Sequence, residues 1–191
     1  MKRSLLMIGF LGFSSTAMGA APLKGWALFG SHPEDYETAL DKTIVHGGKA
    51  SCVLKSKSDK PKGFAALGQV LKPDAYRGKR VRLSGYVRAD KVAGWAGLWM
   101  RIDGPKGSHG LAFDNMQRRP IKGSSGWTRY EIVLDVPQEA SAIWFGALLA
   151  DGAGQIWLDD FKFEVVDRNV ATTDMFRNEP ASEPQNLGFE E

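Results

Sequence analysis

Cysteine is almost absent from the sequence, since Cys52 is the only one in 191 residues. A single thiol cannot form an internal disulfide, so Cys52 is expected to be free. It alternates in register with Ala50 and Leu54, which predicts burial as a small apolar side chain. A nucleophilic cysteine would need an adjacent base, and the sequence around Cys52 offers none.

Recognisable catalytic motifs are also absent. The chain contains no HExxH, GxSxG, P-loop or GxGxxG pattern. Its histidines, His32, His46 and His109, lie in turn-like stretches without metal-ligand spacing, which favours ordinary surface positions. Paired carboxylates of a glycoside hydrolase come from separate strands and leave no local motif. We therefore predict a protein that is not an enzyme, with an unrecognised hydrolase as the least favoured alternative.

No apolar run reaches the ~20 residues that a membrane helix needs. The run from Leu5 to Phe13 follows two basic residues and precedes small residues that end at Ala20, which is typical of a signal peptide. A lipid anchor would need a cysteine at the cleavage point. We expect residues 1–20 to be a signal peptide and the mature protein to be exported, periplasmic or secreted, without a membrane anchor.

Charge is unevenly distributed along the chain, whose net charge is +3. Residues 171–191 carry five acidic side chains against one arginine, whereas residues 21–170 are basic. This asymmetry suggests that the acidic tail lies on the body of the protein. The densest basic run, Arg77 to Arg82, stands where a turn leads into a strand. A solvated turn is the favoured interpretation, and no nucleic-acid partner is predicted.

Helical periodicity is nearly missing after residue 20, while short strand-like segments recur between turn signals. The expected strands span residues 26–29, 36–41, 50–56, 64–71, 80–89, 94–103, 127–135, 141–149 and 155–166. Ser31 could instead cap a short helix before residue 36. Nine strands without βαβ spacing predict one domain over residues 21–170, an all-β, two-sheet antiparallel sandwich of the jelly-roll kind.

The segment from Gly94 to Gly104 carries two different rows of side chains. Its even positions, 96–102, are uniformly apolar and are expected to face the core. Its odd positions mix aromatic and charged residues, and a core does not normally combine those. If residues 80–89 form a hairpin with this strand, Tyr86 and Arg88 join them, and a following polar stretch adds amides. The predicted ligand-binding residues are Trp95, Trp99, Arg101, Asp103, Tyr86, Arg88, Asn115 and Gln117.

Two functions fit this face. The first is a non-catalytic binding module, in which the rings are apolar platforms and the polar groups orient a carbohydrate or other small polar ligand. The second is an interaction or assembly domain whose aromatic face is covered by a protein partner or by its own tail. Exposure of Trp95 and Trp99 discriminates between them: solvent-accessible rings in a groove favour a ligand, whereas cover by a loop or by the tail favours the second function.

Several stretches resemble a known family. They are RGKRVRLSGYVRA, GWAGLWMRIDG, LAFDNMQRRPIKG, the segment from Trp127 to Val166, and NLGFEE. Together they resemble the galactose-binding-like jelly roll of bacterial carbohydrate-binding modules, and more closely a bacterial family often labelled loosely as transcriptional regulators. The resemblance implies sugar binding on a sheet face or loop end, often with a structural calcium. No helix-turn-helix pattern is present in this chain.

The strand at 155–166 and the C-terminus raise a linked expectation. Trp157, Phe161 and Phe163 share one row, and Asp159 intrudes among them, so this carboxylate must be paired, bound to metal or displaced by a bulge. In related jelly rolls an N-L-x-F-E stretch opens the domain, whereas here it closes the chain. Residues 186–190 are therefore expected to return to the vacant edge beside residues 26–29, or to pair with a neighbouring chain in a strand-exchanged homodimer. The expected calcium ligands are Asp159, Asp160 and Glu190.

Overall fold

The computed structural model describes residues 19–20, 23–106 and 110–176. Apart from one short 3-10 helix, η1 (Pro33–Asp35), every regular element in this part of the chain is a strand. The strands are β1 (Gly19–Ala20), β2 (Ala27–Gly30), β3 (Tyr36–Asp41), β4 (Ser51–Ser56), β5 (Phe64–Leu71), β6 (Arg80–Asp103), β7 (Ala112–Asp114), β8 (Ile121–Asp135), β9 (Ala142–Ala150) and β10 (Gln155–Val166). None of the described helices is long and apolar enough to cross a membrane.

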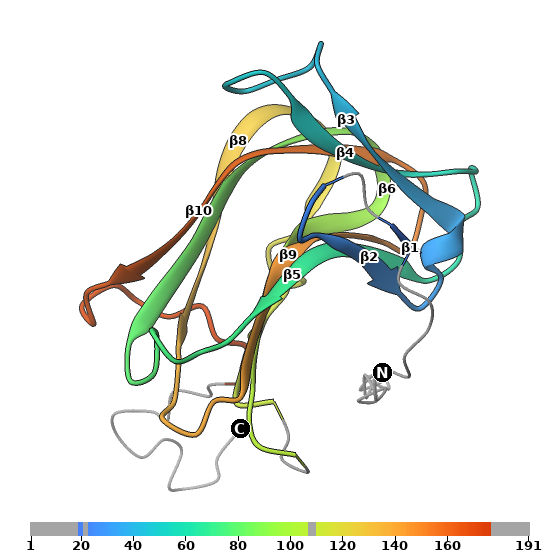
Figure 1. The fold of residues 1–191 in the computed structure, drawn as a ribbon. Coiled ribbons are helices and arrows are strands. Elements are labelled where there is room, and N and C mark those ends of the chain that lie inside the picture. Colours follow the sequence, from blue (N-terminus) through green and yellow to red (C-terminus); the bar gives the residue numbers. More distant parts are fainter. Residues whose placement is uncertain (1–18, 21–22, 107–109, 177–191) are drawn as a thin grey trace, which may run out of the picture.

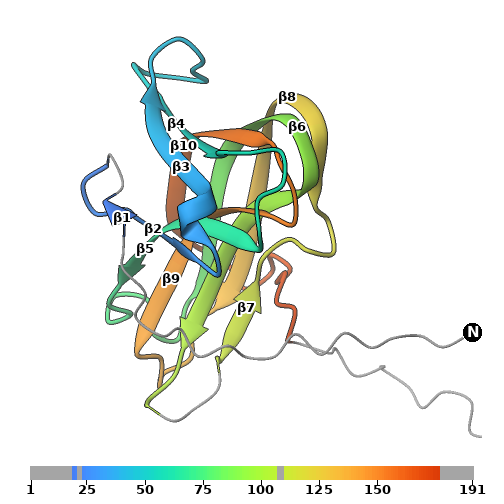
Figure 2. The same ribbon diagram turned by 90° about the vertical axis from the view of Figure 1, so that its right-hand side faces the viewer.

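The strands form one continuous antiparallel sheet that folds over into two layers (Figure 1). The first layer runs β1-β2-β5-β9, then the C-terminal half of β6, then β7. The second layer runs β3-β4-β10, then the N-terminal half of β6, then β8. Strand β6 bends from one layer into the other, so it belongs to both. This arrangement confirms the predicted all-β jelly-roll sandwich, and Figure 2 gives the side view.

The core lies between the inner rows of the two layers. On β6 the even positions Ala96, Leu98, Met100 and Ile102 are fully buried, as their alternation predicted. On β9 the odd positions from Ile143 to Leu149 join the same core, and Phe145 meets Phe163 of β10 with ring centroids 5.2 Å apart. The even positions Trp144, Leu148 and Ala150 belong to a second apolar cluster on the opposite face, so the sequence of β9 is apolar on both faces.

The expected hairpin between residues 80–89 and 94–103 is wrong. Both segments belong to the single strand β6, whose bend passes through Lys91 with φ 51°. The ladder with β8 shifts register three times between Val87 and Ala96. Inward positions are odd before the bend and even after it, so the outward row of each half faces a different side of the molecule.

The prediction that Trp157, Phe161 and Phe163 lie on one face of β10 is also wrong, because a β-bulge interrupts the strand. The register with β6 shifts between Asp159 and Lys162, and Asp160 adopts φ 49°. The extra residue reverses the side-chain alternation. Phe161 and Phe163 therefore pack against the core, while Trp157 faces outward on the second layer. Of the three predicted fates of Asp159, two are observed, since the bulge starts here and the carboxylate is hydrogen-bonded to the backbone amides of His46 and Gly47.

In the full chain the outer edge of β2 is paired with β1, whose two residues belong to the predicted signal peptide. Gly19 and Ala20 of β1 lie opposite Leu28 and Ala27. The returning strand predicted at residues 186–190 lies outside the described residues. Residues 1–18 of the predicted signal peptide also lie outside them. The segment from Ser31 to Tyr36 combines both alternatives that the sequence left open, because η1 leads directly into β3.

In the basic run from Arg77 to Arg82, the three arginines form ion pairs, while Lys79 is exposed in the turn. Arg80 is buried and donates two hydrogen bonds to Asp135, which raises the pKa of Arg80. Arg82 pairs with Glu164 at 2.6 Å and thereby lowers the pKa of that carboxyl group. These contacts lie along the second layer and leave little cationic surface for a polyanion.

Cys52 lies on β4 and is only 7% exposed, which confirms its predicted burial. Burial raises the pKa of the thiol to about 11, because the thiolate would lose its hydration. We expect native protein to resist thiol reagents and unfolded protein to be labelled stoichiometrically, as followed by intact mass. C52A/S58C, with its thiol in an exposed loop, should be labelled in the native state and serves as the control. Stoichiometric labelling of native wild-type protein would contradict the burial.

Candidate functional site

The outer face of the first layer carries a second apolar cluster, separate from the core. Its rings, Phe29, Phe64, Trp95, Trp99 and Trp144, surround the small and aliphatic residues Ala66, Leu148 and Ala150. We call this surface the aromatic face. It is assembled from β2, β5, β6 and β9, so strands distant in sequence contribute to it (Figure 1). A sheet that packs its inner face on a core normally has a polar outer face, which makes this one exceptional.

Trp99 forms the floor of the aromatic face and is only 5% exposed. It lies opposite Gly146 of β9, and Gly146 lies opposite Gly68 of β5. A Cβ atom on Gly68 would stand 2.8 Å from Cζ2 of the Trp99 ring, so the two glycines form a trough for the indole. Phe29 packs edge-on against it with ring centroids 5.5 Å apart. The prediction that Trp99 is an exposed platform is therefore wrong, because cross-strand neighbours cover it.

A row of side chains crosses the aromatic face beside Trp99. Val70 of β5, Trp144 of β9 and Arg101 of β6 lie directly opposite one another. The Arg101 guanidinium stands over the Trp144 ring at 5.7 Å, a cation-π contact. Asp103 accepts two hydrogen bonds from Arg101, at 2.7 and 2.9 Å, so the fork is held in a fixed orientation. Arg101 and Asp103 are thus brought together as predicted, and both are partly exposed.

Trp95 stands at the opposite end of the same β6 row. Its Nε1–H donates to Asp151 at 3.0 Å, which fixes the ring at the rim of the aromatic face. The indole N–H groups of Trp99 and Trp144 differ, since both are buried with no acceptor among the described residues. An orphan donor costs about 1–3 kcal/mol when it loses water. The face therefore holds polar hydrogen-bonding capacity that the described part of the chain does not satisfy.

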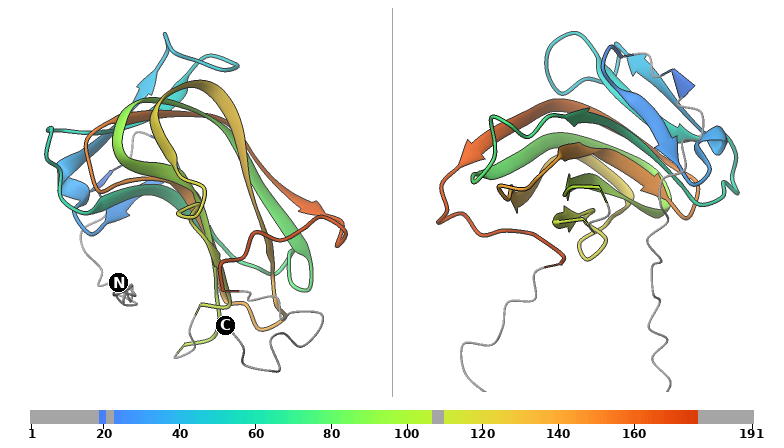
Figure 3. Two further views of the ribbon diagram at one scale, coloured as in Figure 1. Left: turned by 180° about the vertical axis from the view of Figure 1, so that it is seen from behind. Right: turned by 60° about the horizontal axis from the view of Figure 1, so that its bottom comes forward.

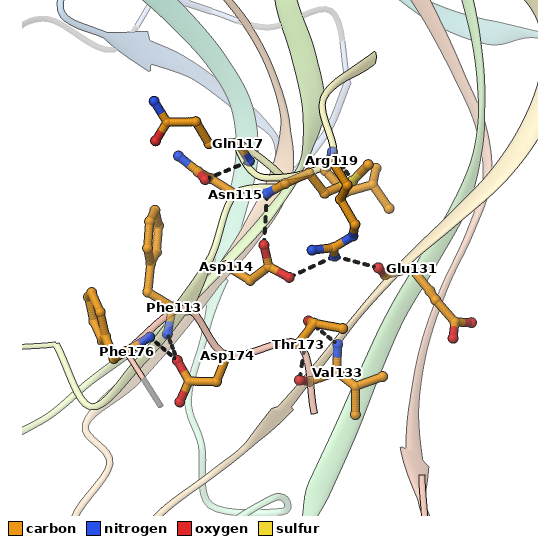
Figure 4. A network of polar contacts seen from close by, with 12 residues as sticks. Phe113, Asp114, Asn115, Gln117, Arg119, Glu131, Val133, Thr173, Asp174 and Phe176 are labelled. Carbon is orange, nitrogen blue, oxygen red and sulfur yellow. Dashed lines mark hydrogen bonds and ion pairs between the residues drawn. The ribbon is translucent and has the colours of Figure 1, made fainter. Parts of the chain in front are cut away.

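Asn115 and Gln117 follow β7 and reach the edge of the aromatic face. Asn115 lies against Gly97, which stands between Trp95 and Trp99 in the outward row of β6. Figure 4 shows that Asn115 and Gln117 project to one side of the turn, while Asp114 points the other way. The Asn115 side chain accepts a hydrogen bond from the Gln117 backbone at 3.0 Å. The backbone carbonyl of Asn115 is the atom that lies close to Gly97, so the turn is placed beside the tryptophan row through its backbone.

Tyr86 and Arg88 lie on the second layer, away from the aromatic face. Tyr86 stacks on His46 with ring centroids 3.6 Å apart, and His46 also contacts Trp127. Arg88 stands over the Trp157 ring at 5.9 Å. The prediction that these two residues complete the tryptophan site is wrong, because it depended on a hairpin that does not form.

The predicted calcium ligands Asp159 and Asp160 hold a loop in place. Asp159 accepts hydrogen bonds from the backbone amides of His46 and Gly47, at 2.8 and 3.1 Å. Asp160 contacts Nδ1 of His46 at 2.6 Å. Among the described residues no group of three or more His, Cys, Asp or Glu side chains is arranged to hold a metal ion. Glu190, the third expected ligand, lies outside them, and calcium binding stays a prediction.

A cavity of about 180 Å³ opens beside Asp159 and Asp160, at one end of the sandwich. Trp26, Leu40 and Cys52 line its apolar side. It does not include the aromatic face, so the acidic pair and the ring cluster are separate features.

Sequence reasoning missed four ring residues on or near the face: Phe29, Phe64, Trp144 and Phe113. Trp144 could not be assigned to a side because β9 is apolar throughout. One available signal was the pair of strand glycines, Gly68 and Gly146, since glycine inside a strand often marks a close approach.

Comparison with known proteins gives one curated relative and many solved structures. An uncharacterized HTH-type transcriptional regulator of Bacillus subtilis, YbfP, is 46% identical over 171 residues, covering 88% of this chain and 57% of that protein. The chain thus spans little more than half the length of its curated relative. No family model matches the chain.

The solved structures share the fold at low sequence identity. The xylan-binding domain CBM22-1 of Paenibacillus barcinonensis Xyn10C is 16% identical with a TM-score of 0.55, covering 78% of this chain and 90% of that one. The module TmCBM61, solved with β-1,4-galactotriose, is 12% identical with a TM-score of 0.50 over 75% and 90% of the two chains. A tailspike domain of bacteriophage CBA120, described as enzymatically active, is 13% identical with a TM-score of 0.58 over 75% and 20%. As its sequence motifs predicted, the protein has the jelly-roll fold of carbohydrate-binding modules.

Proposed function

We propose that the protein is an exported, non-catalytic binding module that holds a carbohydrate on the aromatic face. The observation that carries this proposal is the row of Trp144, Arg101 and Asp103. A flat ring suits the apolar C–H face of a sugar, and a fixed guanidinium-carboxylate pair offers donors and acceptors to its hydroxyl groups. The solved modules that share the fold, described as binding xylan or β-1,4-galactotriose, support the same ligand class.

The positions of the acidic side chains support a non-catalytic role. Asp103 and Asp151, the two carboxylates that hold Arg101 and Trp95 of the aromatic face, are both engaged by these donors. Asp151 follows Ala150, which pairs with Trp95, eight residues before Asp103 on β6. At about 3.3 Å per residue the two positions are about 26 Å apart. Paired carboxylates of glycoside hydrolases stand about 5–9.5 Å apart, so this pair cannot act together.

We expect W144A to lose most of the affinity for carbohydrate. One ring platform with a few hydrogen bonds corresponds to a dissociation constant of roughly 10 μM to 1 mM, and removing that platform should weaken binding about tenfold or more. Xylohexaose and β-1,4-galactotriose are suitable probes, since solved modules of this fold were crystallised with them. Binding is measured by calorimetry and by tryptophan fluorescence.

The matched control is W127A, which removes a partly buried tryptophan from the second layer. It should bind the probes like wild type, and both variants should keep a cooperative thermal transition. Equal losses in W144A and W127A would argue that the ligand does not sit on the aromatic face. If wild-type protein binds neither probe nor any member of a glycan array, carbohydrate binding is refuted.

A protein partner is the second candidate, and the apolar rim of the face favours it. Val70 is 53% exposed at the end of the row that contains Trp144. Exposed aliphatic side chains contribute to protein interfaces but offer little to a hydrated sugar. A variant V70S should leave glycan affinity unchanged and weaken only an interaction with a protein surface.

A further inference from the structure

The segment that follows β10 crosses the open edge of the sandwich from the second layer to the first (Figure 3). Arg80 anchors its start by donating to the carbonyl oxygens of Arg168 and Val170. Thr173 then pairs with the edge strand β8, since its amide donates to the Val133 carbonyl at 2.9 Å and its hydroxyl accepts from the Val133 amide at 3.0 Å. The sequence suggested that the acidic tail lies on the body of the protein, and its first residues, 171–176, lie against the sandwich.

The same segment reaches β7 through Asp174. One oxygen, Oδ1, accepts hydrogen bonds from the backbone amides of Phe113 and Phe176, at 3.1 and 3.0 Å (Figure 4). The Met175 amide donates to the Phe113 carbonyl at 2.7 Å. Both backbone groups of Phe113 are therefore engaged, and the Asp174 carboxylate fixes where Phe176 stands.

The result is a stacked pair of rings at the molecular surface. The Phe113 and Phe176 centroids are 5.6 Å apart with 29° between the ring planes. Phe176 is 44% exposed, although a core position would be more favourable for a phenylalanine. A partly exposed ring pair whose backbone is held by three hydrogen bonds suits a ligand platform.

This ring pair extends the proposed carbohydrate site. Phe113 lies directly opposite Arg101, and Arg101 lies opposite Trp144, so the three belong to one cross-strand row. Neighbouring strands are about 4.8 Å apart, which places the Phe113 and Trp144 positions about 10 Å apart with the Arg101 fork between them. Phe113 projects to the same side of β7 as Asn115 and Gln117 (Figure 4). A single sugar ring cannot reach both platforms.

We propose that the Phe113–Phe176 pair is a second sugar platform and that Asp174 is its positioning residue. The ligand is then an oligosaccharide chain lying across the strands, with one unit on Trp144, polar contacts at Arg101 and another unit on Phe113–Phe176. This inference rests on the proposed function and adds the requirement for a ligand longer than one unit.

The test compares long and short ligands on full-length variants. The probes are xylohexaose with xylobiose, and β-1,4-galactotriose with galactose. F176A should weaken binding of the long ligand about three- to tenfold, the effect of one aromatic contact, and leave the short ligand unchanged. D174A should reproduce this loss, and D174N, which keeps the accepting oxygen, should restore the affinity. Y86A removes an aromatic ring from the other layer and is the control.

Each outcome of these measurements either supports or rejects the Phe113–Phe176 platform. Selective loss of long-ligand affinity in F176A and D174A, with rescue in D174N, supports the platform. Unchanged long-ligand affinity in F176A, while W144A still loses binding, overturns the platform and leaves the proposed function intact. Equal weakening of long and short ligands would mean that Phe176 supports the whole face rather than a separate unit, which also overturns it. Failure of wild-type protein to bind either series rejects both proposals.

Discussion

Replacing Trp99 by alanine is expected to destabilise the protein by about 4 kcal/mol, the range measured when a large buried ring is truncated. Trp99 is 5% exposed and fills the trough over Gly68 and Gly146, two residues that have no side chain with which to close the gap. For a domain of this size the loss corresponds to a fall in melting temperature of about 10 °C. Thermal unfolding followed by circular dichroism measures it.

W95A and W99F are the matched variants for this experiment. Trp95 lies in the same row but is partly exposed, so W95A should lose much less stability than W99A. W99F keeps a ring in the trough and removes an indole N–H that lacks an acceptor among the described residues, and its loss should be intermediate. If W99A melts within about 2 °C of wild type, Trp99 is not a packing residue and the platform interpretation returns.

Much of the fold could be predicted because burial on one side of a sheet imposes a period of two. The row from Ala96 to Ile102 shows this directly, since its four apolar side chains were assigned to the core by alternation alone and all are fully buried. The bounds of β3, β5 and β10 also match the expected strands, because glycine, proline and polar clusters mark the turns between them.

The period-two pattern stops predicting which side chains are buried where a bulge or bend shifts the alternation along a strand. The wrong predictions for β6 and β10 both arose at such shifts. The bend at Lys91 and the bulge at Asp159 and Asp160 both contain a non-glycine residue with positive φ. The sequence therefore has no glycine at these residues that would predict a change of backbone direction. Each phase change moves the following side chains to the opposite face. Tyr86 was therefore assigned to the tryptophan site, and Trp157 to the same row as Phe161, when neither is there.

The site was only half predictable for a related reason. Arg101 and Asp103 are neighbours in one strand, so a local pattern could pair them. Trp144 and Phe113 join them only through cross-strand register with β9 and β7, and register depends on pairings that a single strand does not encode. The coverage of Trp99 by Phe29 of β2 is non-local in the same way.

The second large effect is expected at Gly146, the central residue of the trough. A Cβ atom there would stand 1.9 Å from the carbonyl oxygen of Leu67 and 2.7 Å from the Cα of Gly68. Both are backbone atoms of β5, which cannot rotate away as a side chain could. G146A must therefore separate β5 from β9, the two strands that carry Phe64, Trp144 and the floor under Trp99. We expect a loss of about 3 kcal/mol or more, at or above the usual range for overpacking.

The control for this substitution is G126A, on the exposed part of β8. A Cβ atom at Gly126 meets nothing within 4 Å, so the same chemical change should be neutral or stabilise the protein by up to about 1 kcal/mol, because alanine has less conformational freedom to lose on folding. Urea unfolding of both variants therefore gives shifts of opposite sign if close approach of β5 and β9 determines the effect. A G146A variant as stable as G126A would show that the two strands can separate without cost. In that case Trp99 would not need glycines beneath it, and the aromatic face would be more adaptable to a ligand than its packing implies.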